Sequence, residues 1–305
     1  MKILVATEKP FAKEAVDKIR HVIESAGMEL VLLEKYIEKS QLLEAVSNVD
    51  AIIIRSDIVD KEVLDATKNL KIVVRAGAGY DNVDLAAATA NKVVVMNTPG
   101  QNANAVAELA IGMAIFVLRN QFANASGGEL FDKKLGIHAF GNIGRNLARI
   151  AKGFDMEVYA STRSIPAEEL NKIGVKKVDT VDELYKTCQI VSVHLPANDQ
   201  TKQTINYDLL IQMPKNALLI NTARKEIINE ADLMRIMEER PDFKYVTDIL
   251  PVNHAEMAEK FGNRFFSTQK KIGAQTSEAN INAGVAAAKQ IVDFLVNGNE
   301  TFKVN

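Results

Sequence analysis

The sequence contains a single cysteine, Cys188, among its 305 residues. One thiol can neither form an intramolecular disulfide nor anchor a cysteine metal site, so a reducing compartment is indicated and no metal site is expected. Glycine and proline are also few, with 16 and 7 residues, while apolar residues make up 47% and charged residues 25%. These proportions are typical of globular proteins and exclude collagen-like, low-complexity and disordered chains.

Neither an excess of charge nor a long apolar segment is present. The 37 basic and 39 acidic residues give a net charge of −2, which provides no electrostatic footprint for nucleic acid. The longest apolar run, Ala105 to Leu118, contains Glu108 and falls short of the ~20 residues that span a bilayer. The first residues, MKILVATEKP, become charged too early for a signal-peptide core. We therefore expect a cytoplasmic protein with no nucleic-acid or membrane partner.

Short β-branched runs alternate with amphipathic stretches along the whole chain. Continuous apolar strands separated by helices are typical of a parallel sheet that helices cover on both faces. The expected strands are Ile3–Ala6, Leu30–Leu33, Ala51–Ile54, Ile72–Val74, Val93–Met96, Leu135–Phe140, Glu157–Ala160, Ile190–Val193, Ala217–Ile220, Tyr245–Thr247 and Phe265–Ser267. The expected helices include Ala12–Ser25, Lys61–Lys68, Ala103–Arg119, Asn146–Lys152 and Glu278–Leu295. At roughly 100–200 residues per domain, this alternation predicts an α/β protein with two doubly wound parallel-sheet domains.

One strand runs directly into a glycine-containing turn and a helix, in the segment LGIHAFGNIG of residues 135–144. A dinucleotide site needs glycine where the backbone approaches the pyrophosphate, and a helix N-terminus whose free N–H groups hold the anion. Gly141 and Gly144 fill the second and third glycine positions, whereas Ala139 replaces the first, where alanine can make the turn if its φ stays negative. The segment favours a Rossmann cofactor loop over an ordinary strand–helix turn. The cofactor residues expected here are Gly141, Asn142, Ile143 and Gly144.

The next strand ends without the acidic residue that normally binds the ribose hydroxyls of NAD. Thr162 occupies that place, and Arg163 follows it. Removing a carboxylate and adding a guanidinium is the change that would admit the 2′-phosphate of NADP. The expected cofactor is therefore NAD or NADP. In the alternative interpretation, Arg163 is a solvated loop residue.

Several further segments follow in order along nearly the whole chain. They are Ile54–Ser56, Val74–Asp84, Met96–Pro99, Ala107–Leu109, Val193–Pro196, Asn221–Arg224 and Ile272–Ala274. Together with the glycine loop, they resemble the D-isomer-specific 2-hydroxyacid dehydrogenase family, and within it short D-3-phosphoglycerate dehydrogenases. The resemblance implies a discontinuous substrate-binding domain of residues 1–101 plus 275–305 and a central NAD(P)-binding Rossmann domain of residues 102–274, with the active site in the cleft between them.

The resemblance assigns Arg224 to the carboxylate and keto oxygen of the substrate. A separate physical argument supports the assignment, because a guanidinium presents a planar bidentate fork to a carboxylate and is always charged. Arg224 also lies just past the carboxyl end of an apolar strand, where open α/β sheets place their ligands. The alternative is a surface cation.

The resemblance also assigns the remaining contacts. Asp248 would contact the nicotinamide carboxamide, and His194 and Pro196 would border the ring, although His194 otherwise reads as an ordinary strand-end histidine. Arg55 and Arg75 are candidates for a substrate phosphate, the alternative being internal salt bridges. The full sets are Gly141, Asn142, Ile143, Gly144, Thr162, Arg163, His194, Pro196, Thr222, Ala223 and Asp248 for the cofactor, and Arg55, Ser56, Arg75, Gly77 and Asn102 for the substrate.

Two positions depart from the family pattern. The family normally has a glutamate where this chain has Asn253, and a histidine where it has Lys271. A subset of short phosphoglycerate dehydrogenases is similar in carrying lysine at the histidine position. We therefore expect Lys271 to be the catalytic acid–base residue beside Arg224. His254 is an alternative source of an imidazole, although a helix-start position is the simpler interpretation.

These features favour an oxidoreductase that moves hydride between a nicotinamide cofactor and 3-phosphoglycerate or 3-phosphohydroxypyruvate, in serine biosynthesis. A hydroxypyruvate or glyoxylate reductase, or another D-2-hydroxyacid dehydrogenase, would not need two phosphate-binding arginines. A non-catalytic nucleotide-sensing protein on the same scaffold would explain the missing glutamate and histidine. A homodimer is expected, because the Ala103–Arg119 helix is apolar around most of its circumference and the resembling family pairs through its nucleotide domain.

Overall fold

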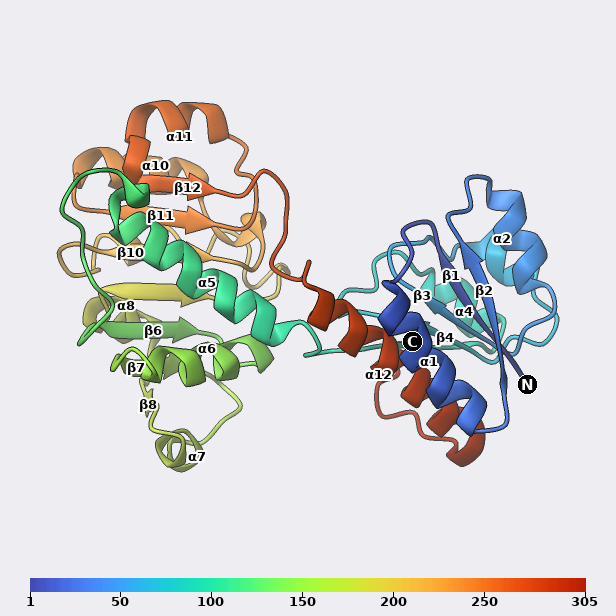
Figure 1. The fold of residues 1–305 in the computed structure, drawn as a ribbon. Coiled ribbons are helices and arrows are strands. Elements are labelled where there is room, and N and C mark those ends of the chain that lie inside the picture. The colour runs from blue at the N-terminus through green and yellow to red at the C-terminus, as the bar shows by residue number, and fades with distance from the viewer. The chain divides into compact units, whose positions relative to one another are not determined.

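The computed structural model describes residues 1–305, which form two compact units. Unit 1 consists of Met1–Asn102 and Gln275–Asn305, and unit 2 of Ala103–Ala274. Each unit contains one parallel β-sheet with helices on both faces, so the predicted α/β fold class is confirmed (Figure 1). Asn102, expected to begin the nucleotide domain, belongs to unit 1.

Unit 1 holds a five-stranded sheet of order β2-β1-β3-β4-β5. The strands are β1 (Lys2–Thr7), β2 (Glu29–Glu34), β3 (Ala51–Ile54), β4 (Ile72–Arg75) and β5 (Val94–Asn97). The helices are α1 (Lys13–Ser25), α2 (Lys39–Val46), α3 (Lys61–Asp65), α4 (Leu85–Ala90) and α12 (Ser277–Asn297). Since the parallel strands share one direction, the loops after β3 and β4 lie at the same edge of this sheet.

The two faces of this sheet follow from the alternation of its strand residues. Ile3 and Val5 of β1 face α1 and α12, whereas Leu4 and Ala6 face α2, α3 and α4. The last helix of the chain therefore packs on the N-terminal sheet, beside α1 (Figure 1). Gly284 allows this close approach, because a Cβ there would lie 2.8 Å from Cδ1 of Ile19.

Unit 2 holds a seven-stranded sheet of order β12-β11-β10-β9-β6-β7-β8. The strands are β6 (Lys134–His138), β7 (Glu157–Ser161), β8 (Lys176–Lys177), β9 (Ile190–Val193), β10 (Leu218–Asn221), β11 (Lys244–Thr247) and β12 (Phe265–Ser267). The helices are α5 (Ala103–Leu118), α6 (Asn142–Lys152), α7 (Ala167–Lys172), α8 (Val181–Thr187), α9 (Tyr207–Leu210), α10 (Glu230–Glu239) and α11 (His254–Phe261), with short 3₁₀ turns η1 (Asn120–Phe122), η2 (Lys225–Ile227) and η3 (Gly262–Arg264).

The chain reverses its direction of winding between β6 and β9, which are neighbours in this sheet. Helices α5 and α6 cover one face of the sheet, and α8 to α11 cover the other. Open α/β sheets bind ligands outside the carboxyl ends of the strands at such a switch point. The topology of unit 2 therefore places its ligand site next to the ends of β6 and β9.

The structure differs from the sequence-based elements mainly at helices. Helix α6 begins at Asn142, a full turn before the expected Asn146, so Gly144 lies inside its first turn. Several short helices that were not expected begin at side-chain caps: Asp84 caps α4, Thr180 caps α8 and Asn229 caps α10. No helix combines the length and the apolar character needed to cross a membrane.

Candidate active site

The turn from β6 into α6 forms the first part of the site. Gly141 is the N-cap of α6 and contributes no side chain, so the first N–H groups of the helix have no protein acceptor from a cap. Such N–H groups, together with the helix dipole, bind anions. A Cβ at Gly141 would meet no protein atom within 4 Å, whereas one at Gly144 would lie 3.0 Å from Cγ2 of Ile137. Gly141 therefore leaves space at the helix end, and Gly144 permits close packing of α6 on β6.

Ala139 adopts a φ of 77°, so the turn forms without the negative φ that an alanine would prefer there. The turn requires a left-handed residue at the first glycine position of the motif, and this chain places an L-residue with a Cβ there. Left-handed backbone costs a non-glycine residue roughly 1–2 kcal/mol. The loop keeps the conformation that glycine normally supplies, at some cost in stability.

A cavity of about 760 Å³ adjoins this turn and the end of β7. Its lining includes residues of the β6–α6 turn, the end of β7, the loop after β9, and helices α8 and α9. Predicted cofactor residues found in this lining are Gly141, Thr162, Arg163 and Pro196. The end of β7 carries no carboxylate, and Arg163 is exposed and forms no hydrogen bond or ion pair within the protein. The size, the free N–H groups and the glycine at the helix end fit a dinucleotide.

Two histidines lie at the ends of β6 and β9. His138 Nδ1 is 3.2 Å from the hydroxyl of the buried Tyr185, and His194 Nε2 is 3.0 Å from Oγ of Ser192. Burial lowers the pKa of His138 to about 4 and that of His194 to about 3. Both imidazoles are therefore neutral at physiological pH and unsuited to proton transfer there. His138 also lines the cavity, although it is not among the site residues expected from the sequence.

Arg224 and Lys271 meet at one carbonyl oxygen after β10. Arg224 Nη1 and Lys271 Nζ each donate a hydrogen bond of 2.8 Å to the carbonyl of Ala223. Much of the Lys271 side chain is exposed, but its amino group makes a partly buried hydrogen bond. Desolvation of this amino group, together with the charge of Arg224, lowers its pKa to about 8. The structure thus brings together the two predicted catalytic residues.

The loop that carries Arg224 is held by Asn221, the buried last residue of β10. Its Nδ2 donates to the carbonyl of Arg224 at 3.0 Å, and its Oδ1 accepts from the N–H of Ala223 at 3.0 Å. Thr222, a predicted cofactor residue, is buried in the same loop, where its Oγ1 is 3.5 Å from Nδ1 of His194. Asparagine at a strand end can bind a ligand, cap a turn or bond the backbone, so the sequence alone does not assign Asn221 its role in holding this loop.

The three positions around the missing glutamate–histidine pair have separate structural roles. Asp248 is fully buried and accepts hydrogen bonds from the segment that contains Lys271. Asn253 donates its backbone N–H to Glu230 at 3.2 Å. His254 begins α11, where its Nδ1 is 2.9 Å from Oγ of Ser267. Because this hydrogen bond engages one ring nitrogen within the fold, the geometry favours a helix-start role for His254.

In unit 1, two arginines lie at the carboxyl edge of the sheet. Arg55 Nη2 donates to Oδ1 of Asn280 at 2.6 Å, and Arg75 Nε donates to the carbonyl of Arg55 at 2.9 Å. Neither guanidinium forms an ion pair within 4.0 Å, so the alternative of internal salt bridges was wrong. Burial lowers the pKa of both side chains, and the Arg55 charge further lowers the pKa of Arg75. Two neighbouring cations without a bonded carboxylate favour anion binding.

The other predicted substrate residues of unit 1 differ in their placement. Gly77 packs against the guanidinium of Arg75, which a Cβ at that position would overlap. Ser56 is exposed on the loop beside Arg55, whereas Asn102 is half-buried and its side chain forms no hydrogen bond. The structure therefore brings Arg55, Arg75 and Gly77 together and leaves Asn102 without an evident role.

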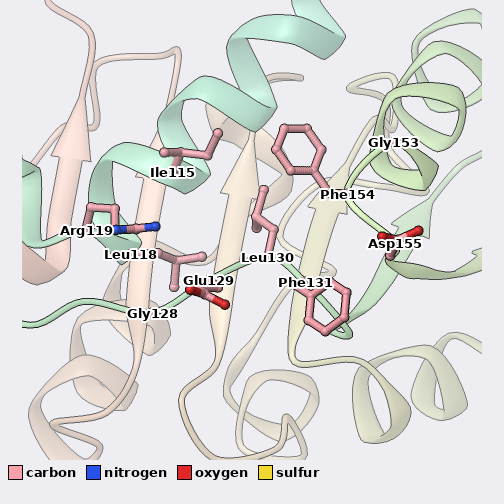
Figure 2. A pocket seen from close by; sticks show the side chains of 10 residues that line it. All are labelled: Ile115, Leu118, Arg119, Gly128, Glu129, Leu130, Phe131, Gly153, Phe154 and Asp155. Atoms are coloured by element: carbon pink, nitrogen blue, oxygen red, sulfur yellow. The ribbon is translucent and has the colours of Figure 1, made fainter.

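A second, smaller hollow of about 330 Å³ lies elsewhere in unit 2 and contains none of the predicted site residues (Figure 2). It is lined by the C-terminal half of α5, the segment before β6 and the turn after α6. Most of its surface is apolar, including Leu118, Leu130 and Phe154. Its lining residues and its apolar character therefore distinguish it from the cavity beside the turn from β6 into α6.

Comparison with known proteins agrees with this geometry. A family model described as the NAD binding domain of D-isomer specific 2-hydroxyacid dehydrogenase matches residues 110–269. A crystal structure of NAD⁺-bound 3-phosphoglycerate dehydrogenase from Entamoeba histolytica is 48% identical, with a TM-score of 0.85, and the match covers 100% of this chain and 98% of that one.

Two curated relatives carry different names. The D-3-phosphoglycerate dehydrogenase of Methanocaldococcus jannaschii is 31% identical over 84% of this chain and 51% of its own length, so the chain spans about half of that relative. The hydroxypyruvate reductase of Thermotoga maritima is 31% identical over 94% of this chain and 96% of its own length. The resemblance inferred from the sequence is thereby confirmed, and the chain belongs to the D-isomer-specific 2-hydroxyacid dehydrogenase family.

Proposed function

We propose that this chain is an NAD(P)-dependent dehydrogenase that interconverts 3-phosphoglycerate and 3-phosphohydroxypyruvate. The observation that carries the proposal is the meeting of Arg224 and Lys271 at the carbonyl of Ala223, which pairs a carboxylate-binding cation with a titratable amine. The family membership and the 48% identity to the Entamoeba histolytica enzyme support the same reaction.

The cofactor would be held by the first turn of α6 and the cavity beside it. The N–H groups of Asn142, Ile143 and Gly144 would bind its pyrophosphate, and Thr162 and Arg163 lie where the adenosine ribose and any 2′-phosphate would be recognised. When bound, the nicotinamide ring accepts hydride in oxidation and supplies it in reduction.

Arg224 and Lys271 divide the remaining chemistry between them. The Arg224 guanidinium would bind the substrate carboxylate and polarise the oxygen at the 2-position. Lys271 Nζ would donate a proton to that oxygen during reduction and accept the hydroxyl proton during oxidation. A pKa of about 8 makes both protonation states accessible near neutral pH, which argues against a decayed, non-catalytic site.

The two arginines of unit 1 favour a phosphorylated substrate. Because Arg55 and Arg75 have no carboxylate partner, their two charges would be available to a second anionic group. A hydroxypyruvate or glyoxylate reductase remains the second candidate function, supported by the Thermotoga maritima relative that matches nearly end to end.

Steady-state kinetics with purified protein test the choice between these substrates. We expect turnover of 3-phosphoglycerate, and Arg55→Ala or Arg75→Ala should raise KM for 3-phosphohydroxypyruvate by about tenfold or more while changing KM for hydroxypyruvate little, since each lost charge-assisted hydrogen bond is worth ~1.5–3 kcal/mol. Arg20→Ala on the exposed face of α1 is the matched control. Parallel losses for both substrates would support the reductase instead.

A further inference from the structure

The carboxylate of Asp248 lies directly after β11 and is completely buried. Its Oδ1 accepts hydrogen bonds from Oγ1 of Thr268 and from the N–H of Ile272, both at 2.9 Å. Its Oδ2 accepts from the N–H of Gly273 at 2.7 Å. These three hydrogen bonds come from within the protein and hold the buried carboxylate in one position.

All three donors belong to the one segment that carries Lys271. Thr268 precedes Lys271 in this segment, and Ile272 and Gly273 follow it directly. Residues 269–271 therefore lie between two ends that are both hydrogen-bonded to the side chain of Asp248. Gly273 fits because it has no Cβ, since a Cβ there would be 2.8 Å from Oδ2 of Asp248. The position of the Lys271 backbone is therefore fixed from both sides by Asp248, the residue that follows β11.

We propose that Asp248 is a positioning residue for Lys271: it closes the 268–273 turn and thereby keeps the amino group at the carbonyl of Ala223. This inference rests on the proposed role of Lys271. It assigns to Asp248 a role toward the protein in addition to the expected contact with the nicotinamide carboxamide. In this arrangement, the chain uses the aspartate to fix a lysine where the family normally pairs a glutamate with a histidine.

The charge of Asp248 also acts on Lys271. Three charged groups face the lysine: Arg224 lowers its pKa, and Asp248 and Glu226 raise it. Loss of the Asp248 charge alone therefore lowers the pKa of Lys271 further below its usual value. Loss of the turn alone exposes the amino group and raises its pKa toward that value. The two effects have opposite signs, so the pH profiles of variants that remove only one of them distinguish charge from geometry.

The main test is the Asp248→Asn variant in the intact protein, measured as kcat for the oxidation against pH. The amide oxygen still accepts from Thr268 and Ile272, while its NH₂ group faces the N–H of Gly273. We expect the plateau kcat to fall on the order of 10²-fold, because small displacements of a catalytic group cost that much. In this variant the loss of charge and the loss of the turn shift the pKa of Lys271 in opposite directions, so the fall of the plateau kcat carries the test.

Two matched variants separate charge from geometry. Glu226→Gln removes a nearby charge and leaves the 268–273 turn unchanged. It should therefore shift the rise of kcat with pH slightly to lower pH and keep the plateau value of kcat. Gly273→Ala strains the turn and keeps the charge of Asp248. It should therefore lower the plateau value of kcat without shifting the rise of kcat to lower pH. Each protein is first compared by its circular dichroism spectrum and melting temperature with the original chain.

The possible outcomes separate this inference from the proposed function. An Asp248→Asn variant whose only change is a higher KM for the cofactor, with an unchanged plateau kcat, overturns the positioning role and leaves Lys271 intact as acid–base. Near-normal kcat in Lys271→Ala overturns the proposed role of Lys271 and the inference with it. Added ethylamine should restore part of the activity of Lys271→Ala and none in Asp248→Asn, because only the first variant lacks the amine.

Discussion

At the residue scale, the proposed acid–base role of Lys271 predicts how the rate depends on pH. Its amino group has a pKa of about 8, lowered by burial and by Arg224. Oxidation needs the neutral amine, so kcat for oxidation should rise with pH through about 8, whereas kcat for reduction needs the ammonium and should fall over the same range. Stopped-flow measurements in both directions between acidic and alkaline pH would record the two limbs.

Substitution of Lys271 tests the same assignment. Lys271→Ala should bind cofactor normally and lose about 10²–10⁴ in kcat, the contribution typical of a general acid–base group. Lys271→His should recover part of the activity with an oxidation limb shifted to lower pH, because an unperturbed histidine side chain has a pKa of about 6.5. Loss of activity in His254→Ala, with Lys271→Ala nearly unchanged, would transfer the role to His254.

Arg163 tests the choice of cofactor. The side chain is exposed, lines the cofactor cavity and has no protein partner, so nothing within the chain competes for it. Arg163→Ala should therefore weaken NADPH binding by ~1.5–3 kcal/mol, the worth of a charge-assisted hydrogen bond, and leave NADH nearly unchanged. Isothermal titration with both cofactors measures the difference. Equal effects on the two cofactors would identify Arg163 as a solvated loop residue.

Residue roles differ in how far the sequence can reveal them. The sequence alone singled out Arg224 and Lys271 as candidates, because each stands at a recognisable strand end or motif position, and the structure brings their side chains together. The hydrogen bonds from Thr268 and Gly273 to Asp248 could not be predicted, because they depend on which loops two adjacent strands bring together. The same holds for the depressed pKa of His138, which comes from burial beside Tyr185 and not from any local pattern.

At the scale of elements, the turn from β6 into α6 contains backbone strain that a single substitution should remove. Ala139 stands at φ 77°, in the left-handed region that glycine adopts without a steric cost. Ala139→Gly should stabilise the protein by up to about 1 kcal/mol, since relief of the Cβ clash outweighs the extra chain entropy of glycine. Urea unfolding with an unchanged m-value would show it. A lower stability would mean that the strain is absorbed elsewhere in the loop.

Strands could be predicted from the sequence more fully than helices. Each expected strand exists, because buried parallel strands such as β3 and β9 are short apolar runs that leave little choice of conformation. Short helices such as α4 and α10 were not expected, since they depend on caps at Asp84 and Asn229 and on packing against a sheet. The start of α6 was placed a turn late because the first turn contains Gly144, a residue that disfavours helices in isolation.

At the scale of the whole molecule, we propose a homodimer that forms through unit 2. Helix α5 keeps Ile115 and Leu118 only partly buried, although it is strongly apolar. Beside it, the hollow of Figure 2 carries Phe131, which is 61% exposed, and Phe154, which is 36% exposed. Exposed apolar surface of this kind, gathered around a hollow, is typical of a protein–protein contact.

Sedimentation equilibrium at micromolar concentration should therefore give twice the chain mass of 33.5 kDa. Phe131→Glu should shift the mass toward that of one chain, because it would bury an unpaired carboxylate at the contact. Ile37→Glu is the matched control, since Ile37 is 88% exposed in unit 1, and it should leave the mass unchanged. A single-chain mass for the original protein would exclude the dimer, and a dimer that survives Phe131→Glu would place the contact on another surface.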